Sequence, residues 1–164
     1  VSSSAGPKTV ADYGFDDAPE LDLILIPGGI GTIPELKNET LLNFLRLRCP
    51  QSQATMSVCT GSALLAKAGL LDGLAATSNK MFFELARSQG GEVDWRESAR
   101  WVDAGQYVTS SGVSAGTDMA LAVIERVFGA ELAEQVMNYT EYQWHRQADD
   151  DPFAQLLNQG VTPS

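Results

Sequence analysis

Cys59 is the residue of this chain whose setting points most directly to chemistry. It follows the extended run Ala54–Val58 and precedes small and leucine residues with helical spacing. A nucleophile at such a strand-to-helix turn needs small residues two positions before and after it, and these are Ser57 and Gly61. A helix beginning at Thr60 would direct its N–H groups toward the sulfur, which lowers the thiol pKa and favours the thiolate. The alternative is a buried structural cysteine, a common setting for a free thiol.

A glycine-rich loop is the second feature with chemical potential. The nearly continuous apolar run Leu21–Ile26 is typical of a strand buried on both faces of a parallel sheet, and the loop Pro27–Gly31 ends it. A dinucleotide-binding fingerprint is not supported, because Pro34 stands where its third glycine is required. The glycines instead allow a sharp turn whose N–H groups point into a cleft. Thr32 and Glu35 then fit a helix capping box.

A third small-residue segment, Ser110–Gly116, follows an apolar run and leads into a long helical pattern. Open α/β folds bind ligands at the carboxyl ends of their parallel strands. We therefore expect Gly29 and Gly112 to line the same cleft as Cys59. Ser111 either adds a hydroxyl group to that cleft or caps the turn.

Composition restricts the class of protein. The chain has 164 residues, of which 44% are hydrophobic, which suffices for one compact domain with a core. A net charge of −10 argues against nucleic acid as a partner and gives no reason to expect a membrane surface. No apolar run is long enough to cross a bilayer, and no secretory signal pattern is visible. We interpret Cys49 and Cys59 as reduced thiols, which favours a cytoplasmic location.

Strands alternate with helices along the chain, so we expect an α/β fold over residues 1–164, without repeats or an interdomain linker. Thr9–Ala11 and Leu74–Thr77 are expected to be short strands, and a hairpin with the three-residue loop Asp103-Ala104-Gly105 is expected further on. The remaining helices are expected over residues 41–49, 113–128 and 130–142. A further helix is expected to begin after a cap at Ser78 or Asn79 and to end at Gly90.

Several motifs together resemble one family. They are Pro27-Gly28-Gly29, Ser57–Gly61, Ala68–Gly73 and Ser110–Asp118, in this order and spacing. They resemble the ThiJ/PfpI branch of the class I glutamine amidotransferase-like superfamily, and within it the isonitrile hydratases and the amidotransferase-like domains of AraC-type regulators. The resemblance implies a flavodoxin-like three-layer α/β sandwich with a mostly parallel sheet, a small β-hairpin, a nucleophile elbow at Cys59 and a homodimer.

The chain departs from this family pattern in two places. Members usually begin with a βαβ unit whose first strand is followed by an acidic residue beside the cysteine, and this unit has no counterpart here. We therefore expect a complementary N-terminal segment or chain that carries this carboxylate. Many relatives place histidine directly after the cysteine, where this chain has Thr60, as the isonitrile hydratases do. His145 lacks the His-x-Glu signature of the amidotransferases, so we interpret it as packing beside Trp144.

Two functions from different classes fit these residues. In the first, the Cys59 thiolate adds to an electrophilic carbon of a small molecule, the Thr60 hydroxyl orients water, and no metal or cofactor takes part. For an isonitrile the product is an N-substituted formamide. Residues expected to bind the substrate or stabilise its developing charge share the loops around the elbow: Gly28, Gly29, Ile30, Ser111 and Gly112, together with the N–H of Thr60. The alternative is a non-catalytic domain that uses Cys59 to sense a ligand or oxidation.

Overall fold

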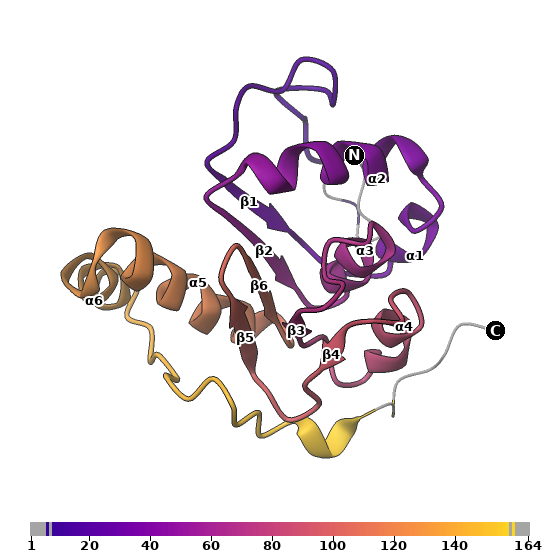
Figure 1. Ribbon diagram of the computed structural model, residues 1–164. Helices are drawn as coiled ribbons and strands as arrows, with labels where there is room; N and C mark the ends of the chain where they lie inside the picture. The colour runs from indigo at the N-terminus through magenta and orange to yellow at the C-terminus, as the bar shows by residue number, and fades with distance from the viewer. Residues whose placement is uncertain (1–5, 7, 158, 160–164) are drawn as a thin grey trace.

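The fold is built on a four-stranded, mostly parallel sheet (Figure 1). The computed structural model describes residues 6, 8–157 and 159. The strand order is β1 (Leu23–Ile26), β2 (Ala54–Val58), β6 (Tyr107–Ser110) and β5 (Trp101–Ala104). β1, β2 and β6 run parallel and β5 is antiparallel to β6, so the elbow strand β2 lies inside the sheet. β3 (Ala75–Ala76) and β4 (Asp94–Trp95) form a separate parallel pair.

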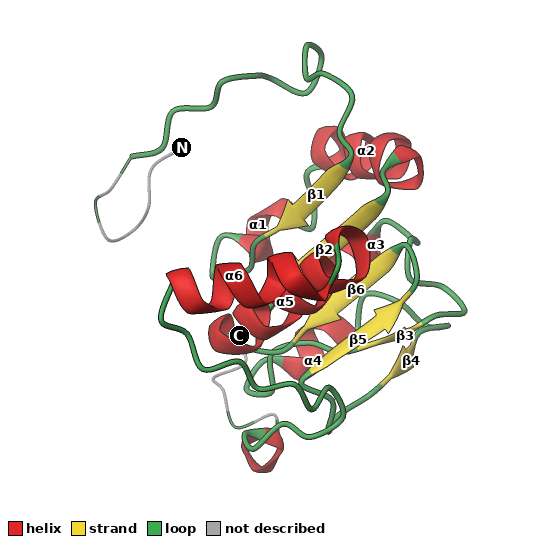
Figure 2. Cartoon of the chain, turned by 90° about the vertical axis from the view of Figure 1, so that its left-hand side faces the viewer, coloured by secondary structure: helices red, strands yellow, loops and turns green. Residues whose placement is uncertain are grey.

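Helices cover both faces of the sheet, as Figures 1 and 2 show, which confirms the flavodoxin-like three-layer architecture. α2 (Glu39–Arg48) and α3 (Gly61–Lys67) pack on one face, while α5 (Val113–Phe128) packs on the other, with α6 (Ala130–Tyr139) beside it. Two short helices, α1 (Thr32–Glu35) and α4 (Phe83–Arg87), follow loops near the elbow. Within the described residues no helix is long and apolar enough to cross a membrane.

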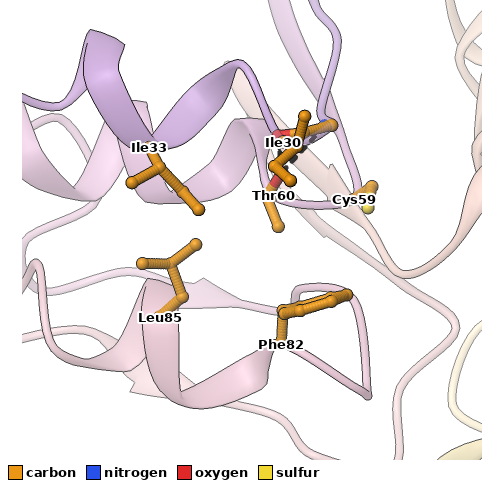
Figure 3. A pocket seen from close by; sticks show the side chains of 7 residues that line it. Ile30, Ile33, Cys59, Thr60, Phe82 and Leu85 are labelled. Carbon is orange, nitrogen blue, oxygen red and sulfur yellow. Dashed lines mark hydrogen bonds between the residues drawn. The ribbon is translucent and has the colours of Figure 1, made fainter. Parts of the chain in front are cut away.

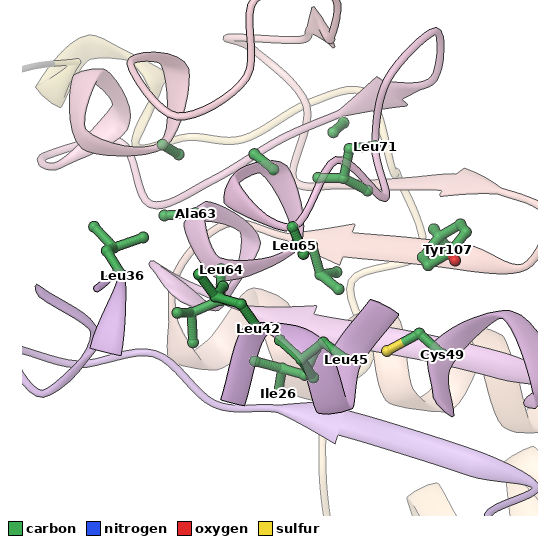
Figure 4. Packing of buried hydrophobic residues seen from close by; sticks show 14 of the residues in the cluster. Ile26, Leu36, Leu42, Leu45, Cys49, Ala63, Leu64, Leu65, Leu71 and Tyr107 are labelled. Carbon is green, nitrogen blue, oxygen red and sulfur yellow. The ribbon is translucent and has the colours of Figure 1, made fainter. Parts of the chain in front are cut away.

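Two apolar clusters separate the layers. The larger lies between the sheet and α2 and α3, and its fully buried members include Leu42, Leu65 and Leu71 (Figure 4). The second contains Met56 and Met119 and lies between the sheet and α5. The alternation along β2 therefore points Ala54 and Met56 at one helical layer and Thr55 and Ser57 at the other.

β1 corrects the prediction that the run Leu21–Ile26 is buried on both faces. Ile24 and Ile26 are buried, but Leu23 is 37% exposed and Leu25 is 56% exposed. β1 is the edge strand. In the described part of the chain no helix lies over the side of β1 that carries Leu23 and Leu25 (Figure 2). The run has the composition of a central strand, whereas its surroundings are those of an edge.

Several other elements differ from the expected boundaries. Thr9–Ala11 is not a strand. The hairpin loop contains two residues, because Ala104 still pairs with Tyr107 and the Asp103 carboxylate accepts a 2.9 Å hydrogen bond from the Gly105 N–H. α4 ends before Gly90, and α6 ends at Tyr139. In each case local hydrogen bonds end or extend an element by a few residues, which sequence patterns do not resolve.

Gly61 gives a direct test of the tight packing at the elbow. A Cβ atom at this position would lie 2.4 Å from the Ile26 carbonyl oxygen, which belongs to the neighbouring strand and cannot move freely. We expect Gly61→Ala to lower the free energy of unfolding by roughly 1–3 kcal/mol, as overpacking does. Urea denaturation measures the change. Gly31→Ala is the matched control, because nothing lies within 4 Å of that Cβ position; equal midpoints for the two variants would contradict the prediction.

Candidate active site

Cys59 occupies the left-handed backbone region, with φ +57°, which confirms the strained conformation expected of an elbow. Four hydrogen bonds hold it there. Its N–H donates to the carbonyl oxygens of Ser111 at 2.8 Å and Ser110 at 3.2 Å. Its own carbonyl oxygen accepts from the hydroxyl groups of Ser78 at 3.1 Å and Ser62 at 3.2 Å. The strain is therefore stabilised from β6, from the segment after β3 and from α3.

Gly28 allows the glycine-rich loop to touch the elbow. A Cβ atom at Gly28 would lie 2.6 Å from the Thr60 backbone nitrogen and 2.8 Å from the Cys59 Cβ. Any side chain at position 28 would push the loop away from Cys59. Gly28 lines a groove beside β1 and is outside the described lining of the Cys59 pocket. Its contribution to the site is therefore to let the loop approach Cys59 closely.

An apolar pocket of about 360 Å³ opens beside the cysteine (Figure 3). Ile33 of α1 and Leu85 of α4 face each other across it, and Phe82 lies opposite Ile30. The described residues that line it are Gly29, Ile30, Ile33, Cys59, Thr60, Phe82 and Leu85. Since none of these side chains is charged, the pocket suits an uncharged, largely apolar molecule.

The thiol pKa differs from the expectation drawn from the helix N-terminus. Burial raises the pKa of the Cys59 thiol, and hydrogen bonds from the Thr60 N–H, the Thr60 hydroxyl and the Asn79 side chain only partly offset this. The prediction of a lowered pKa was therefore wrong, because desolvation of the thiolate outweighs the donors. An attack at neutral pH then requires a base to remove the thiol proton.

Thr60 also has a different role from the expected one. Its hydroxyl accepts a 3.0 Å hydrogen bond from the Gly29 N–H, lies 3.0 Å from the Thr32 hydroxyl, and shares its single proton between the Gly29 carbonyl at 3.3 Å and the Cys59 thiol. These bonds tie the glycine-rich loop to the elbow and leave neither the hydroxyl to orient water nor the Gly29 N–H to stabilise charge in this conformation. The Thr32 hydroxyl bonds Thr60, so the expected capping box with Glu35 does not form.

A second, polar pocket of about 200 Å³ contains the residues expected from the third loop. Gly29 lines the Cys59 pocket as predicted, but Ser111 and Gly112 line this neighbouring one. The described lining residues of the second pocket are Asn79, Lys80, Met81, Arg100, Ser111, Gly112, Ser114, Asp151, Phe153 and Leu156. Ser111 and Gly112 thus line a different pocket from Gly29, although the Ser111 carbonyl accepts a hydrogen bond from the Cys59 N–H.

Charged side chains are concentrated on this second side of the elbow. Lys80 and Asp151 are buried and lie 3.8 Å apart, and Arg100 lies 3.7 Å from the other carboxylate oxygen of Asp151. Burial lowers the pKa of Lys80 to about 8, and Asp151 opposes this shift. The pockets on the two sides of Cys59 thus differ in character, one apolar and one ionic.

Three residues that line the Cys59 pocket were not identified from the sequence: Ile33, Phe82 and Leu85. Phe82 and Leu85 were predicted only as core positions of the helix after Ser78 or Asn79. They reach the pocket because α4 packs on α3, a contact between segments about 20 positions apart. His145 lies outside the described lining of the Cys59 pocket, and its N–H donates to Asp118 at 2.9 Å.

Iodoacetamide is expected to label Cys59 well before Cys49. Both thiols have raised pKa values through burial, but Cys49 is fully buried while Cys59 is partly exposed at a pocket. The access of iodoacetamide to each sulfur therefore decides the order of labelling. Peptide mapping after partial labelling at pH 8 measures the ratio, and preferential modification of Cys49 would contradict the assignment of Cys59 as the reactive thiol.

A strained cysteine at a strand-to-helix turn, at the carboxyl edge of a parallel sheet between helices, defines an α/β protein with a nucleophile elbow. The family model "DJ-1/PfpI family" matches residues 1–126. The chain belongs to this family.

The relatives include enzymes and regulators. The chain is 36% identical to an isonitrile hydratase of Pseudomonas putida over 142 residues, which covers 87% of this chain and 61% of that protein. It is 31% identical to the HTH-type transcriptional regulator GbdR of Pseudomonas aeruginosa, covering 92% of this chain and 40% of the regulator. A crystal structure of a ThiJ/PfpI family protein from Pseudomonas syringae superposes with a TM-score of 0.76 at 31% identity, covering 93% of this chain and 61% of that chain. The chain thus spans less than two thirds of the length of these relatives.

Proposed function

We propose that this protein is part of a cysteine-dependent, cofactor-free hydratase that acts on a small, uncharged electrophile of the isonitrile class. The observation that carries the proposal is the position of Cys59, strained at φ +57° beside an apolar pocket of about 360 Å³. The similarity to isonitrile hydratase supports the choice of substrate class.

The proposed reaction has two steps. The Cys59 sulfur bonds to the terminal isonitrile carbon, and a proton is delivered to that carbon, which gives a thioimidate. Water then adds to the same carbon as the C–S bond breaks, with one water proton passing to nitrogen and the other to sulfur, and the N-substituted formamide leaves. The Thr60 N–H, which already hydrogen-bonds the thiol, is the proposed donor to charge that develops beside the sulfur. Gly29 and Ile30 are proposed to contact the substrate from the rim of the pocket.

The base for the first step is proposed to come from a strand that pairs with β1. No carboxylate lines the Cys59 pocket in the described part of the chain, and burial raises the thiol pKa. The open edge of β1, with the exposed side chains of Leu23 and Leu25, continues into a groove of about 640 Å³ that Phe15, Leu41 and Phe44 help to line. An apolar edge of this kind favours pairing with a further strand. We propose a complementary strand-and-helix segment carrying a carboxylate, and a homodimer of the completed unit.

The open edge gives its own test. Residues 1–164 expressed alone are expected to self-associate and to lack hydratase activity, and Leu25→Lys is expected to reduce the association because a charge on an edge strand blocks pairing. Sedimentation velocity measures the association of the unmodified chain and of Leu25→Lys, and a product assay measures hydratase activity. A monomeric, active protein would show that the base lies within this chain.

Product analysis tests the hydratase itself. The complete protein, with any complementary segment present, is incubated with cyclohexyl isocyanide, and formation of N-cyclohexylformamide is followed by NMR. Protein alkylated beforehand at Cys59 is the control and is expected to form no product. Absence of turnover by the unmodified protein would reject the proposed activity.

A sensing domain is the second candidate, favoured by the similarity to the regulator GbdR and by the raised thiol pKa. It predicts binding of a small apolar ligand, or oxidation of Cys59, without turnover. A ligand-induced rise in melting temperature together with absent product formation would select it over the hydratase. The two free cysteines fit a reducing compartment, and we propose the cytoplasm.

A further inference from the structure

α4 is anchored on one side and lines the Cys59 pocket with the other. Phe83 and Ala86 are fully buried, and the Phe83 ring packs edge to face against Trp95 with ring centroids 5.7 Å apart. Phe82 and Leu85 each come one position earlier, are half-buried and line the pocket. Because residues three positions apart share a face of a helix, this pattern gives the segment one side for the core and one for the pocket.

Backbone hydrogen bonds hold the two pocket residues of this segment in place. The Asn79 Oδ1 accepts from the N–H groups of Met81 at 3.0 Å and Phe82 at 3.2 Å. The Leu85 N–H donates to the Phe82 carbonyl at 3.1 Å. None of these bonds uses the side chain of Phe82 or Leu85, so we expect both side chains to be replaceable while α4 keeps its position.

The opposite wall of the pocket comes from the glycine-rich loop and α1. Ile33 faces Leu85 across the pocket, and Phe82 lies opposite Ile30 (Figure 3). The Ile33 N–H donates to the Ile30 carbonyl at 3.2 Å, and the Thr32 hydroxyl between them ties this wall to the elbow. The width of the pocket is therefore set by two facing pairs of apolar side chains on anchored backbone.

We propose that Leu85 and Phe82 are specificity-determining residues, which select an isonitrile that carries a bulky branched or cyclic hydrocarbon group. Such a group fills the space of about 360 Å³ between α1 and α4, while the reacting carbon lies at Cys59 on the same pocket. A methyl group leaves most of this apolar wall uncovered, and one methylene in an apolar pocket changes kcat/KM by about tenfold or more. The isonitrile part of the inference rests on the proposed function, whereas selection by size concerns the pocket alone.

The experiment compares kcat/KM for methyl, cyclohexyl and adamantyl isocyanide in the complete protein. We expect the unmodified protein to prefer cyclohexyl over methyl isocyanide by at least about 10²-fold. Leu85→Ala widens the pocket and is expected to raise the ratio of adamantyl to cyclohexyl about tenfold, with Phe82→Ala acting in the same direction. Leu85→Phe narrows it and is expected to lower the ratio of cyclohexyl to methyl about tenfold or more.

A ratio between two substrates separates selection from folding, because a loss of folded protein lowers both rates equally. Leu70→Ala is the matched control, since Leu70 is also a half-buried leucine packed against the same apolar cluster as Leu85, but it lies outside the described lining of the pocket. This control is expected to leave both ratios unchanged. Ratios that stay unchanged in both Leu85→Ala and Leu85→Phe would overturn the inference.

Binding distinguishes a failure of this inference from a failure of the proposed hydratase. An unmodified protein that turns over none of the three isonitriles would reject the proposed function. Calorimetry with N-methylformamide and N-cyclohexylformamide then tests the pocket without any reaction. We expect the cyclohexyl compound to bind more tightly to the unmodified protein and about tenfold more weakly to Leu85→Phe. Equal affinities of the unmodified protein for the two formamides would overturn selection by size.

Discussion

Replacing Cys59 by alanine in the complete protein is expected to lower kcat/KM for the proposed isonitrile hydration by at least about 10³-fold, because it removes the proposed covalent nucleophile and with it the step on which the others depend. The pocket itself should survive, since Ile33, Phe82 and Leu85 supply most of its apolar wall. Ligand binding measured by calorimetry is therefore expected to persist. Cys49→Ala is the control and is expected to retain activity; equal losses in both variants would indicate a structural cause.

Cys59→Gly is expected to separate the stability of the elbow from its chemistry. A residue other than glycine in the left-handed region costs about 1–2 kcal/mol, and part of this is offset by the greater freedom of glycine in the unfolded chain. Cys59→Gly should therefore be inactive but up to about 1 kcal/mol more stable than Cys59→Ala. Urea denaturation of the two variants measures the difference. A less stable glycine variant would show that the elbow is not strained.

The elbow could be predicted because its requirements are local. A strand, a tight turn and a helix N-terminus each leave a pattern within a few residues, and Ser57 and Gly61 meet the steric demand on either side of Cys59. The structure adds the reason for Gly61, whose Cβ position meets the Ile26 carbonyl. The α/β class followed from the alternation of strand and helix patterns, whereas the three-layer sandwich was implied by the resemblance to the family.

The parts that could not be predicted depend on contacts between distant segments. Leu23 and Leu25 belong to an apolar run, yet their exposure depends on whether another element covers β1. The Thr32 hydroxyl could equally cap its own helix or bond Thr60, and only the folded loop decides between them. The predicted cap at Ser78 or Asn79 does not form on α4, which begins at Phe83 without a side-chain cap; Asn79 Oδ1 instead accepts from the N–H groups of Met81 and Phe82 in the turn before it.

The largest stability effect is expected at Arg100, directly before β5. Its Nε and one terminal nitrogen lie 2.7 and 2.6 Å from Oδ2 of Asp118, which is fully buried on α5, and its other terminal nitrogen lies 3.7 Å from Asp151. Arg100→Met would leave two buried carboxylates with one fewer cation. Breaking a buried ion pair in this way typically costs about 3–5 kcal/mol, because the remaining charge is uncompensated.

Urea denaturation of Arg100→Met measures this cost, and Arg126→Met is the matched control. Arg126 pairs with Asp103 at 2.5 Å, but both side chains are at least 33% exposed, so its loss is expected to cost less than about 1 kcal/mol. A double variant, Arg100→Met with Asp118→Leu, should recover part of the lost stability, since it removes the uncompensated carboxylate as well. Similar urea midpoints for Arg100→Met and Arg126→Met would mean that water screens the ion pairs of Arg100. The segment that carries Asp151 would then have to be held by backbone hydrogen bonds, which the N–H groups of Arg100 and Trp101 donate to the Ala148 carbonyl.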